Sequence, residues 1–174
     1  TYGHRNSQGI DWLPNGVPVV TEHGPSNRDE IQVLRPGDNY GWPDVRSPPG
    51  DDGYGSYPDH DDVRPPVVNT GPSSGWAPTG ATFYTGDSVP AFQNRYIVGG
   101  LISQAVYVVT LTPPGVELPS LDGESRRFDG DWTDDAYTAT AHRILEDELG
   151  RVRHVTQSPS GDLYAITSNR DGRA

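Results

Sequence analysis

The chain of 174 residues contains no cysteine, no methionine and no lysine. Without cysteine there can be no disulfide, no thiolate metal site and no cysteine nucleophile. The sequence also lacks a run of about 18 apolar residues, the minimum for a membrane-spanning helix. All 13 basic residues are arginine, against 24 acidic residues. The net charge of −11, with no basic patch, argues against nucleic acid as a partner.

The residues that are present point to an ordered β protein. Glycine (21) and proline (17) are frequent but follow no period, which excludes a collagen-like chain and predicts many turns. The hydrophobic fraction of 32% is low, but four Trp, nine Tyr and several apolar strands argue against disorder. Many acids without lysine favour a salt-adapted source, since molar salt screens self-repulsion. A GC-rich genome, which favours arginine, is the alternative.

Apolar residues alternate with polar ones at a period of two, which predicts strands rather than helices. The clearest hairpin joins residues 9–13 to residues 17–21 through Asn15-Gly16, a favoured two-residue turn. The remaining predicted strands are residues 31–34, 80–84, 94–100, 105–111, 140–145, 152–156 and 163–167.

A weak repeat indicates that these strands form several similar sheets. Residues 14–21 (PNGVPVVT) resemble residues 159–167 (PSGDLYAIT), and a third group of strands lies between them. The acidic segments 43–75 and 112–137, rich in proline and glycine, are expected to be long loops. Three antiparallel sheets, about 10 to 12 strands in all, with almost no helix are typical of propeller blades.

The first candidate site lies in residues 3–9, directly before the first predicted strand. His4, Arg5, Asn6 and Gln8 have side chains long enough to reach a ligand. The alternative is a loop whose polar groups cap the end of the strand. The residues alone leave both interpretations open.

The second candidate site lies in residues 21–30, after a predicted strand. Calcium binds six to eight oxygen atoms from carboxylates and backbone carbonyls on irregular loops. Gly24 and Pro25 could present such carbonyls, and Asp29 and Glu30 could supply carboxylates. A solvated turn is the alternative. Zinc is not indicated, because the five histidines lack the spacing of a zinc site.

The third candidate is the pair Arg151 and Arg153. The two residues are two positions apart on a predicted strand, so their side chains are expected to point to the same face. Guanidinium groups placed in this way could clamp carboxylates through paired hydrogen bonds. The alternative in so acidic a chain is an internal ion pair with a neighbour such as Asp171. The acidic stretches 51–62 and 129–135 are predicted to be solvated surface.

Several short motifs together resemble one known family. They are GHRNSQG at 3–9, TEHGP at 21–25, DEI at 29–31, NYGWP at 39–43, FYTGD at 83–87, VGGL at 98–101 and the run at 150–173. In this order they closely resemble the soluble quinoprotein sugar dehydrogenases. These are the glucose/sorbosone or aldose sugar dehydrogenases that use pyrroloquinoline quinone (PQQ). The resemblance covers nearly the whole chain.

The resemblance implies an all-β, six-bladed β-propeller with PQQ and calcium on its top face. Residues 1–174 would form its C-terminal portion and supply about three blades. Arg5 and Asn6 resemble the pair that contacts the quinone carbonyls, which gives them a catalytic role. The other positions that resemble cofactor contacts are Gln8, His23, Arg151 and Arg153.

The resemblance also implies two calcium sites and a contact with substrate. Gly24 and Pro25 resemble the pair whose carbonyls bind the calcium linked to PQQ. A second, structural calcium is implied, and the residues that resemble its ligands are Glu30, Tyr40 (through its carbonyl) and Asp51. Trp76 aligns with a position near the substrate.

Two departures from the family pattern bear on activity. Some members carry a lysine that contacts PQQ just after the VGGL-like segment, and Ile102 occupies that position here. The general-base histidine of the family lies upstream of the GHRN motif, before Thr1, so none of the five histidines is assigned that role. We therefore expect the chain to be part of a longer protein and the isolated piece to be inactive.

The activity implied by the resemblance is oxidation of an aldose sugar to its lactone. A base would take the proton of the anomeric hydroxyl while hydride passes to the quinone. Calcium and Arg5 would stabilise charge on the quinone oxygen. Electrons would leave to an external acceptor, and the family implies a periplasmic or extracellular location. A non-catalytic propeller that acts as a binding module is the alternative.

Overall fold

The computed structural model describes residues 1–51 and 53–168. The regular structure in this part is strand, apart from two single-turn 3-10 helices, η1 (Tyr57–Asp59) and η2 (Pro90–Phe92). No helix within these residues is long and apolar enough to cross a membrane. The β fold predicted from the sequence is confirmed.

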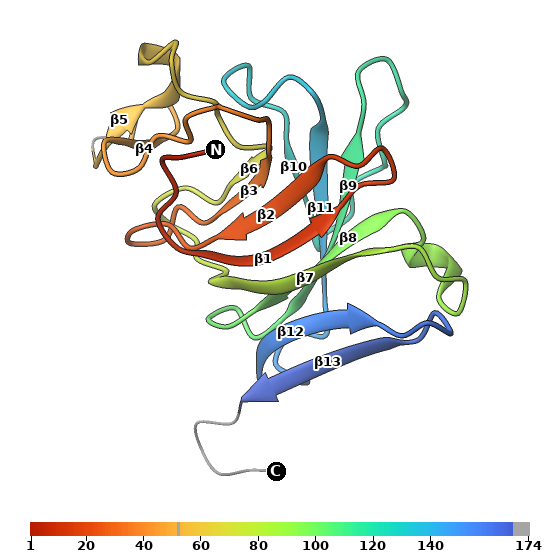
Figure 1. Cartoon of the computed structure of the whole chain (residues 1–174). Coiled ribbons are helices and arrows are strands. Elements are labelled where there is room, and N and C mark those ends of the chain that lie inside the picture. Colours follow the sequence, from red (N-terminus) through yellow and green to blue (C-terminus); the bar gives the residue numbers. More distant parts are fainter. Residues whose placement is uncertain (52, 169–174) are drawn as a thin grey trace.

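The first sheet contains four antiparallel strands in the order β1-β2-β3-β6 (Figure 1). Their bounds are β1 (Ser7–Trp12), β2 (Pro18–Glu22), β3 (Glu30–Val33) and β6 (Val68–Asn69). β1 and β2 form the predicted hairpin, in which Gly16 has a φ of 81° that disfavours any side chain. The register of β2 and β3 places Glu22 directly opposite Glu30.

The second sheet begins at β7 and continues outward through β8, β9, β11 and β10. Its strands are β7 (Pro78–Tyr84), β8 (Arg95–Gly100), β9 (Val106–Thr112), β11 (Thr138–Ile144) and β10 (Ser125–Phe128). A final hairpin consists of β12 (Arg151–Gln157) and β13 (Leu163–Ser168). One parallel pair, His154 opposite Gly80, attaches this hairpin to β7.

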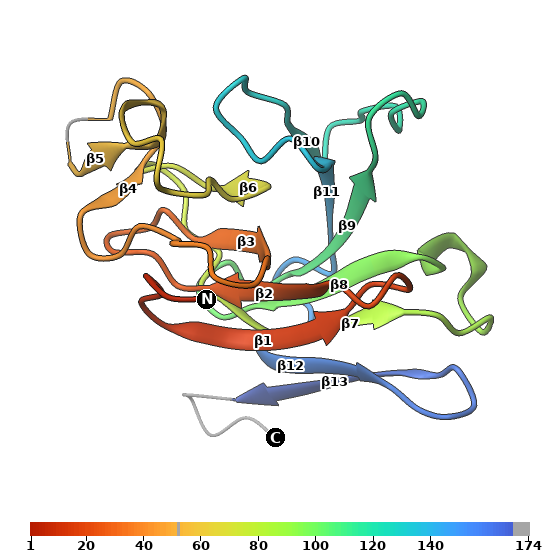
Figure 2. The same cartoon turned by 45° about the horizontal axis from the view of Figure 1, so that its top comes forward.

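β1, β7 and β12 lie side by side and run in the same direction, one from each unit (Figures 1 and 2). Their close approach requires glycine. A Cβ atom on Gly9 would lie 2.7 Å from the carbonyl oxygen of Thr79, and one on Gly80 would overlap the ring of His154. The chain therefore contains two complete propeller blades and the first hairpin of a third.

Hydrogen bonds join neighbouring blades close to the start of these inner strands. Thr21 Oγ1 donates to the carbonyl oxygen of Thr79 (2.8 Å), and Thr79 Oγ1 lies 3.0 Å from the carbonyl oxygen of Val152. The Tyr96 hydroxyl donates to the carbonyl oxygen of Val19 (3.1 Å) and so links the first two sheets through their core. Residues at the ends of β1, β7 and β12 are thereby held in fixed positions relative to one another.

An apolar core fills the space between the first two sheets. It is built from β-branched and aromatic side chains that alternate along the strands. Its members include Val19, Ile31, Val33, Val68, Ala81, Tyr96, Val98, Val109 and Ala139. A second cluster packs β12 against the second sheet and includes Tyr84, Ile97, Val108, Val152 and Val155.

Two segments predicted as loops contain short strands. Segment 43–75 holds β4 (Val45–Ser47), β5 (Gly55–Ser56) and β6, and segment 112–137 holds β10. The described chain therefore has 13 strands rather than 10 to 12. These added strands have two to four residues, too few for alternation to be visible in the sequence, and tertiary contacts determine their conformation.

Candidate cofactor-binding face

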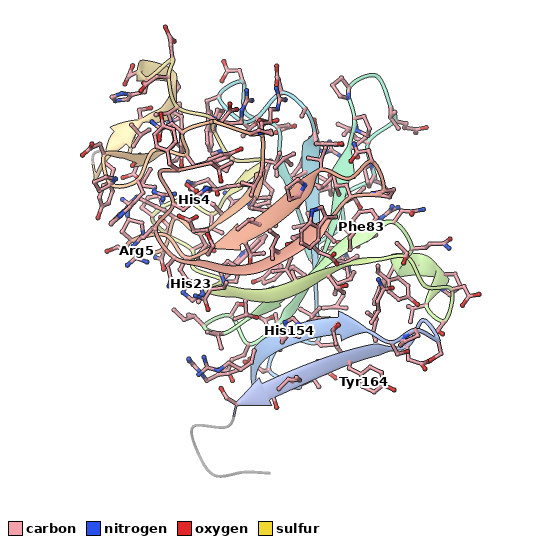
Figure 3. All side chains as sticks on the ribbon, viewed as in Figure 1. His4, Arg5, His23, Phe83, His154 and Tyr164 are labelled. Carbon is pink, nitrogen blue, oxygen red and sulfur yellow. The ribbon has the colours of Figure 1, made fainter. Side chains whose placement is uncertain are left out.

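The inner strands of the three units all begin at one end of the molecule. Residues 4–6 lead into β1, and Arg151 opens β12. Figure 3 shows His4, Arg5 and His23 gathered at this end. The fold therefore brings candidate residues from distant parts of the sequence to the same end of adjacent strands.

Arg5 is exposed, yet both its backbone and its side chain are anchored. Its backbone N–H donates to Glu22 Oε1 (2.6 Å), and its Nη1 donates to the carbonyl oxygen of His23 (3.1 Å). The guanidinium carbon lies 5.3 Å from the centre of the Trp42 ring, a cation–π distance. No carboxylate in the described chain forms an ion pair with this guanidinium, so its charge remains available to a ligand.

Asn6, Gln8 and His23 form a polar group beside Arg5. Gln8 Nε2 donates to Asn6 Oδ1 (2.7 Å), and Asn6 Nδ2 lies 3.5 Å from His23 Nδ1. The other ring nitrogen, His23 Nε2, is buried and finds no hydrogen-bond partner among residues 1–51 and 53–168. Buried polar atoms are normally paired, so this group fits a polar partner from outside the chain.

The arginines of β12 depart from the predicted alternation. The register of the strand breaks at Arg153, where a β-bulge disturbs the simple two-residue period. Arg153 is exposed and its Nε donates to Ser168 Oγ (2.9 Å), whereas Arg151 is half-buried and its Nε has no hydrogen-bond partner within the described part of the chain. Neither forms an ion pair with a carboxylate that the structure describes, and Asp171 lies outside the described residues.

The loop at Gly24 and Pro25 brings carbonyl groups together. Ser26, Asn27 and Arg28 all have positive φ angles, which fold the loop tightly. A Cβ atom on Gly24 would overlap the carbonyl groups of Asn27 and Arg28. Arg28 Nη1 also lies 3.3 Å from the carbonyl oxygen of Pro25. The loop is rich in carbonyl oxygens, the ligands that a hard cation prefers, but a cation bound at Pro25 would have to displace the Arg28 guanidinium.

Asp29 binds backbone N–H groups rather than completing this cradle. Its Oδ1 accepts from the N–H of Gly24 (3.1 Å). Its Oδ2 accepts from the N–H groups of Trp76 (2.7 Å) and Ala77 (2.8 Å). The carboxylate is thus satisfied by the backbone, and it ties the loop to the start of β7.

The residues predicted to bind a structural calcium are not gathered into one set. Glu30 binds Arg46 (2.7 Å), while Asp51 binds Arg28 through two bonds of 2.6 Å each. Tyr40 is buried separately, in the first blade. The described residues contain no group of three or more His, Asp or Glu side chains that could hold a metal ion. The expected calcium set stays a prediction, and calcium there would have to displace the guanidinium groups that bind Glu30 and Asp51.

Glu22, Glu30 and Arg46 form a fully buried ionic cluster that was not predicted from the sequence. All three residues are at most 1% exposed. Arg46 Nη2 donates to Glu22 Oε1 (2.6 Å), and Arg46 Nη1 donates to Glu30 Oε2 (2.7 Å). Both glutamates lie one residue outside the predicted strands 17–21 and 31–34, and Arg46 reaches them from a segment that shows no pattern, so no sequence signal pointed to the cluster.

This cluster pushes the pKa values of its two carboxyls apart. Burial raises the pKa of Glu30 to about 7, although Arg46 and the Tyr57 hydroxyl act in the opposite direction. Burial also acts on Glu22, but a hydrogen bond with His4 and the charge of Arg46 bring the pKa of this carboxyl below its usual value. One guanidinium thus serves two carboxyls whose pKa values are shifted in opposite directions, because burial prevails at Glu30 and the hydrogen bonds and charge around Glu22 prevail there.

Trp76 belongs to the core rather than to an open site. Its side chain stacks on Tyr107 with ring centroids 3.9 Å apart and meets Phe128 edge-on. Only 5% of the residue is exposed, so the predicted contact with substrate is corrected to a packing role. Ile102, at the position of the family lysine, is exposed, and its backbone N–H donates to the carbonyl oxygen of Trp76.

Comparisons with known proteins agree with this fold. A family model described as Glucose / Sorbosone dehydrogenase matches residues 1–174. An uncharacterized protein of Synechocystis is 30% identical over 177 residues, covering 99% of this chain and 37% of that protein. Aldose sugar dehydrogenase YliI of Escherichia coli is 29% identical over 177 residues, covering 99% of this chain and 41% of that protein.

Solved structures give the same result. The apo-form of the soluble aldose sugar dehydrogenase from Escherichia coli matches 97% of this chain and 43% of its own, with 30% identity and a TM-score of 0.69. The PQQ-bound aldose sugar dehydrogenase of Streptomyces coelicolor matches 99% of this chain and 40% of its own, with 28% identity and a TM-score of 0.62.

The strand arrangement and these matches define part of a sugar dehydrogenase β-propeller. The chain belongs to the glucose/sorbosone dehydrogenase family. It spans about two fifths of the length of the curated relatives that it matches along its whole length, 37% of one and 41% of the other.

Proposed function

We propose that the intact protein is a PQQ-dependent dehydrogenase that oxidises an aldose to its lactone, and that this chain supplies one side of the cofactor site. The observation that carries the proposal is the group around Arg5 and His23. It presents a guanidinium without a carboxylate partner and a buried imidazole nitrogen without a hydrogen bond. Arg151 and Arg153 add two more guanidinium groups at the start of an adjacent strand, and neither forms an ion pair with a carboxylate among residues 1–51 and 53–168.

Each of these residues has a plausible chemical task toward such a cofactor. When bound, PQQ would supply the quinone carbon that accepts hydride from the sugar. The Arg5 guanidinium and the Asn6 amide would donate to quinone oxygens, where negative charge increases during reduction. Gln8 orients the Asn6 amide through their mutual hydrogen bond. Arg151 and Arg153 would hold carboxylates through charge-assisted bonds.

We also propose calcium at the carbonyl groups of Gly24 and Pro25, because this tight loop offers hard oxygen ligands beside His23. The ion would take the place of the Arg28 guanidinium, which donates to the carbonyl oxygen of Pro25 in this structure. Calcium there would withdraw charge from the same quinone oxygens that Arg5 contacts. The second calcium is not part of the proposal, since Glu30 and Asp51 already bind arginines.

The general base is assigned to a part of the protein outside this chain. His4 contacts the buried Glu22, and His142 lies 2.9 Å from Ser125 Oγ on the outer strands. His154 packs over Gly80. The isolated chain is therefore proposed to be inactive. The intact enzyme is proposed to act outside the cytoplasm, to include this chain as the C-terminal portion of its propeller, and to pass electrons to an external acceptor.

Titration of the intact apoprotein with PQQ tests the proposal. Absorption spectra recorded with and without calcium should show saturable PQQ binding that calcium strengthens. The loaded protein should then oxidise aldoses to lactones with an artificial electron acceptor. A calcium-saturated intact protein that binds no PQQ would instead support a binding module, the function that Ile102 in place of the family lysine favours.

A further inference from the structure

Two glutamates oppose each other across neighbouring strands inside the first blade. The register of β2 and β3 places Glu22 directly opposite Glu30, and neither residue is more than 1% exposed. Like charges directly opposite each other destabilise a sheet, and their removal from water adds a desolvation cost. A pair of this kind requires a cation close to both carboxylates.

Arg46 reaches both of them from the segment that follows β3. Its two terminal nitrogens bind one carboxylate each, at 2.6 Å for Glu22 and 2.7 Å for Glu30. Nη2 also lies 3.3 Å from the carbonyl oxygen of Gly3, and the guanidinium carbon lies 5.5 Å from the centre of the Trp42 ring. A planar fork suits this bridging position better than a point charge does.

The carboxylate oxygens have no free lone pair for a metal ion. Each of the four oxygens has two polar neighbours within hydrogen-bond distance. Besides Arg46, the groups around Glu30 are Tyr57, Gln32 and Asn69. Besides Arg46, the groups around Glu22 are the N–H of Arg5 and the side chains of His4 and Ser7. Calcium, which needs six to eight oxygen ligands, would have to displace these groups.

We infer that Arg46 is the resident cation of this site, in place of the structural calcium that the family resemblance implies near Glu30. Through Glu22 it is also a positioning residue for Arg5. Glu22 Oε1 accepts two bonds of 2.6 Å, one from Arg46 Nη2 and one from the backbone N–H of Arg5. The guanidinium therefore fixes the point from which the Arg5 side chain projects.

The calcium content of the intact protein tests this inference without PQQ. The cofactor-free protein is dialysed against calcium, and the ions per chain are counted by mass spectrometry for wild type, Glu30→Gln and Arg46→Ala. Wild type and Glu30→Gln should bind equal numbers of ions. Loss of one ion in Glu30→Gln would overturn the inference, because calcium would then be the resident cation.

Arg46→Ala should bind one calcium ion more than wild type, and calcium should raise its melting temperature by more than it raises that of wild type. If both proteins bind the same number of calcium ions and calcium raises both melting temperatures equally, the Arg46 guanidinium does not occupy a place that calcium could take. If Arg46→Ala does not fold, the comparison of Glu30→Gln with wild type still decides, because neither protein lacks the guanidinium.

A double-mutant cycle tests the positioning role. Arg46→Lys keeps the positive charge but loses the planar guanidinium that binds both carboxylates. In a protein with Arg5 intact, this change should raise the PQQ dissociation constant at least threefold. In the Arg5→Ala background the same change should have no further effect on the PQQ dissociation constant. Equal effects in both backgrounds would show that Arg46 does not act through Arg5. The calcium count remains valid even if PQQ does not bind.

Discussion

Two arginines lie against the ring of Trp42, and their surroundings differ completely. Arg46 is fully buried and binds two carboxylates, with its guanidinium carbon 5.5 Å from the ring centre. Arg5 is exposed at 5.3 Å from the same ring, and its side chain donates to a carbonyl oxygen only. The comparison teaches that carboxylate partners mark an arginine as structural, whereas an arginine without one in the described chain can serve a ligand if it also lies at the cofactor-binding face.

The contrast is informative because this chain has 24 acidic residues for 13 arginines. In such a chain an arginine has many potential partners, so one without a carboxylate requires an explanation. The arginines that form ion pairs with described carboxylates are Arg28, Arg35, Arg46, Arg64 and Arg143. Arg95, Arg126 and Arg127 form none among the described residues, and they donate to backbone carbonyl oxygens instead. The candidate cofactor residues Arg5, Arg151 and Arg153 form no ion pair with the described carboxylates.

Loss of the buried guanidinium is expected to have the largest effect on stability. Arg46→Met leaves two buried carboxylates without their counter-ion, which typically costs ~3 to 5 kcal/mol. Arg143→Met is the matched control, because Arg143 also binds two carboxylates but lies at the surface, where such a pair contributes ~0 to 1 kcal/mol. Denaturant unfolding of the intact variants measures both, and equal losses would remove the distinction between the two classes of arginine.

The pH dependence of stability sharpens the same comparison. Burial raises the pKa of Glu30 to about 7 from a value of 4.5. The unfolded chain therefore releases this proton at lower pH than the folded one, so stability falls as pH rises from 4.5 to about 7. Glu30→Gln should lack this contribution, and the wild-type advantage in melting temperature should shrink across that window. An advantage that grows instead would mean that Arg46 keeps Glu30 ionised.

Most of the fold could be predicted from the sequence because most of its strands are marked by patterns of neighbouring residues. Alternation and the Asn15-Gly16 turn located the hairpins correctly, since both are properties of adjacent residues. The short strands β6 and β10 were missed because long-range pairing determines them. The bulge at Arg153 could not be foreseen, as a single extra residue leaves no trace in the pattern.

The candidate site could be predicted only where a motif carried it. Arg5 and His23 lie at the same end of the blade, as the motifs implied, whereas Trp76 lies in the core. The partners of Glu30 and Asp51 could not be foreseen, because arginines from other segments reach them through tertiary structure. Motifs identify the residues in a site, but they do not reveal which carboxylates are already paired with arginines from other segments of the chain.

Arg153→Ala tests the other side of the comparison. Removal of a guanidinium that binds a cofactor carboxylate costs ~1.5 to 3 kcal/mol, so the PQQ dissociation constant should rise at least tenfold. The melting temperature should stay nearly constant, because the side chain is exposed and Ser168 Oγ is its one hydrogen-bond acceptor among the described residues. Arg153→Lys should restore part of the affinity, since an ammonium cannot form the fork. A fall in melting temperature with unchanged PQQ affinity would place Arg153 among the structural arginines.

The smallest expected effect comes from the aromatic ring that both arginines share. Trp42→Leu removes a cation–π contact of ~0.5 to 1 kcal/mol from Arg5, so the PQQ dissociation constant should rise about two- to fivefold. The same change should lower the melting temperature, because Arg46 loses its contact with the ring as well. Trp42→Phe keeps an aromatic face and should retain most of both properties. If Trp42→Leu lowers the melting temperature but leaves PQQ affinity unchanged, the ring supports Arg46 alone and Arg5 is positioned entirely by its bonds to Glu22 and His23.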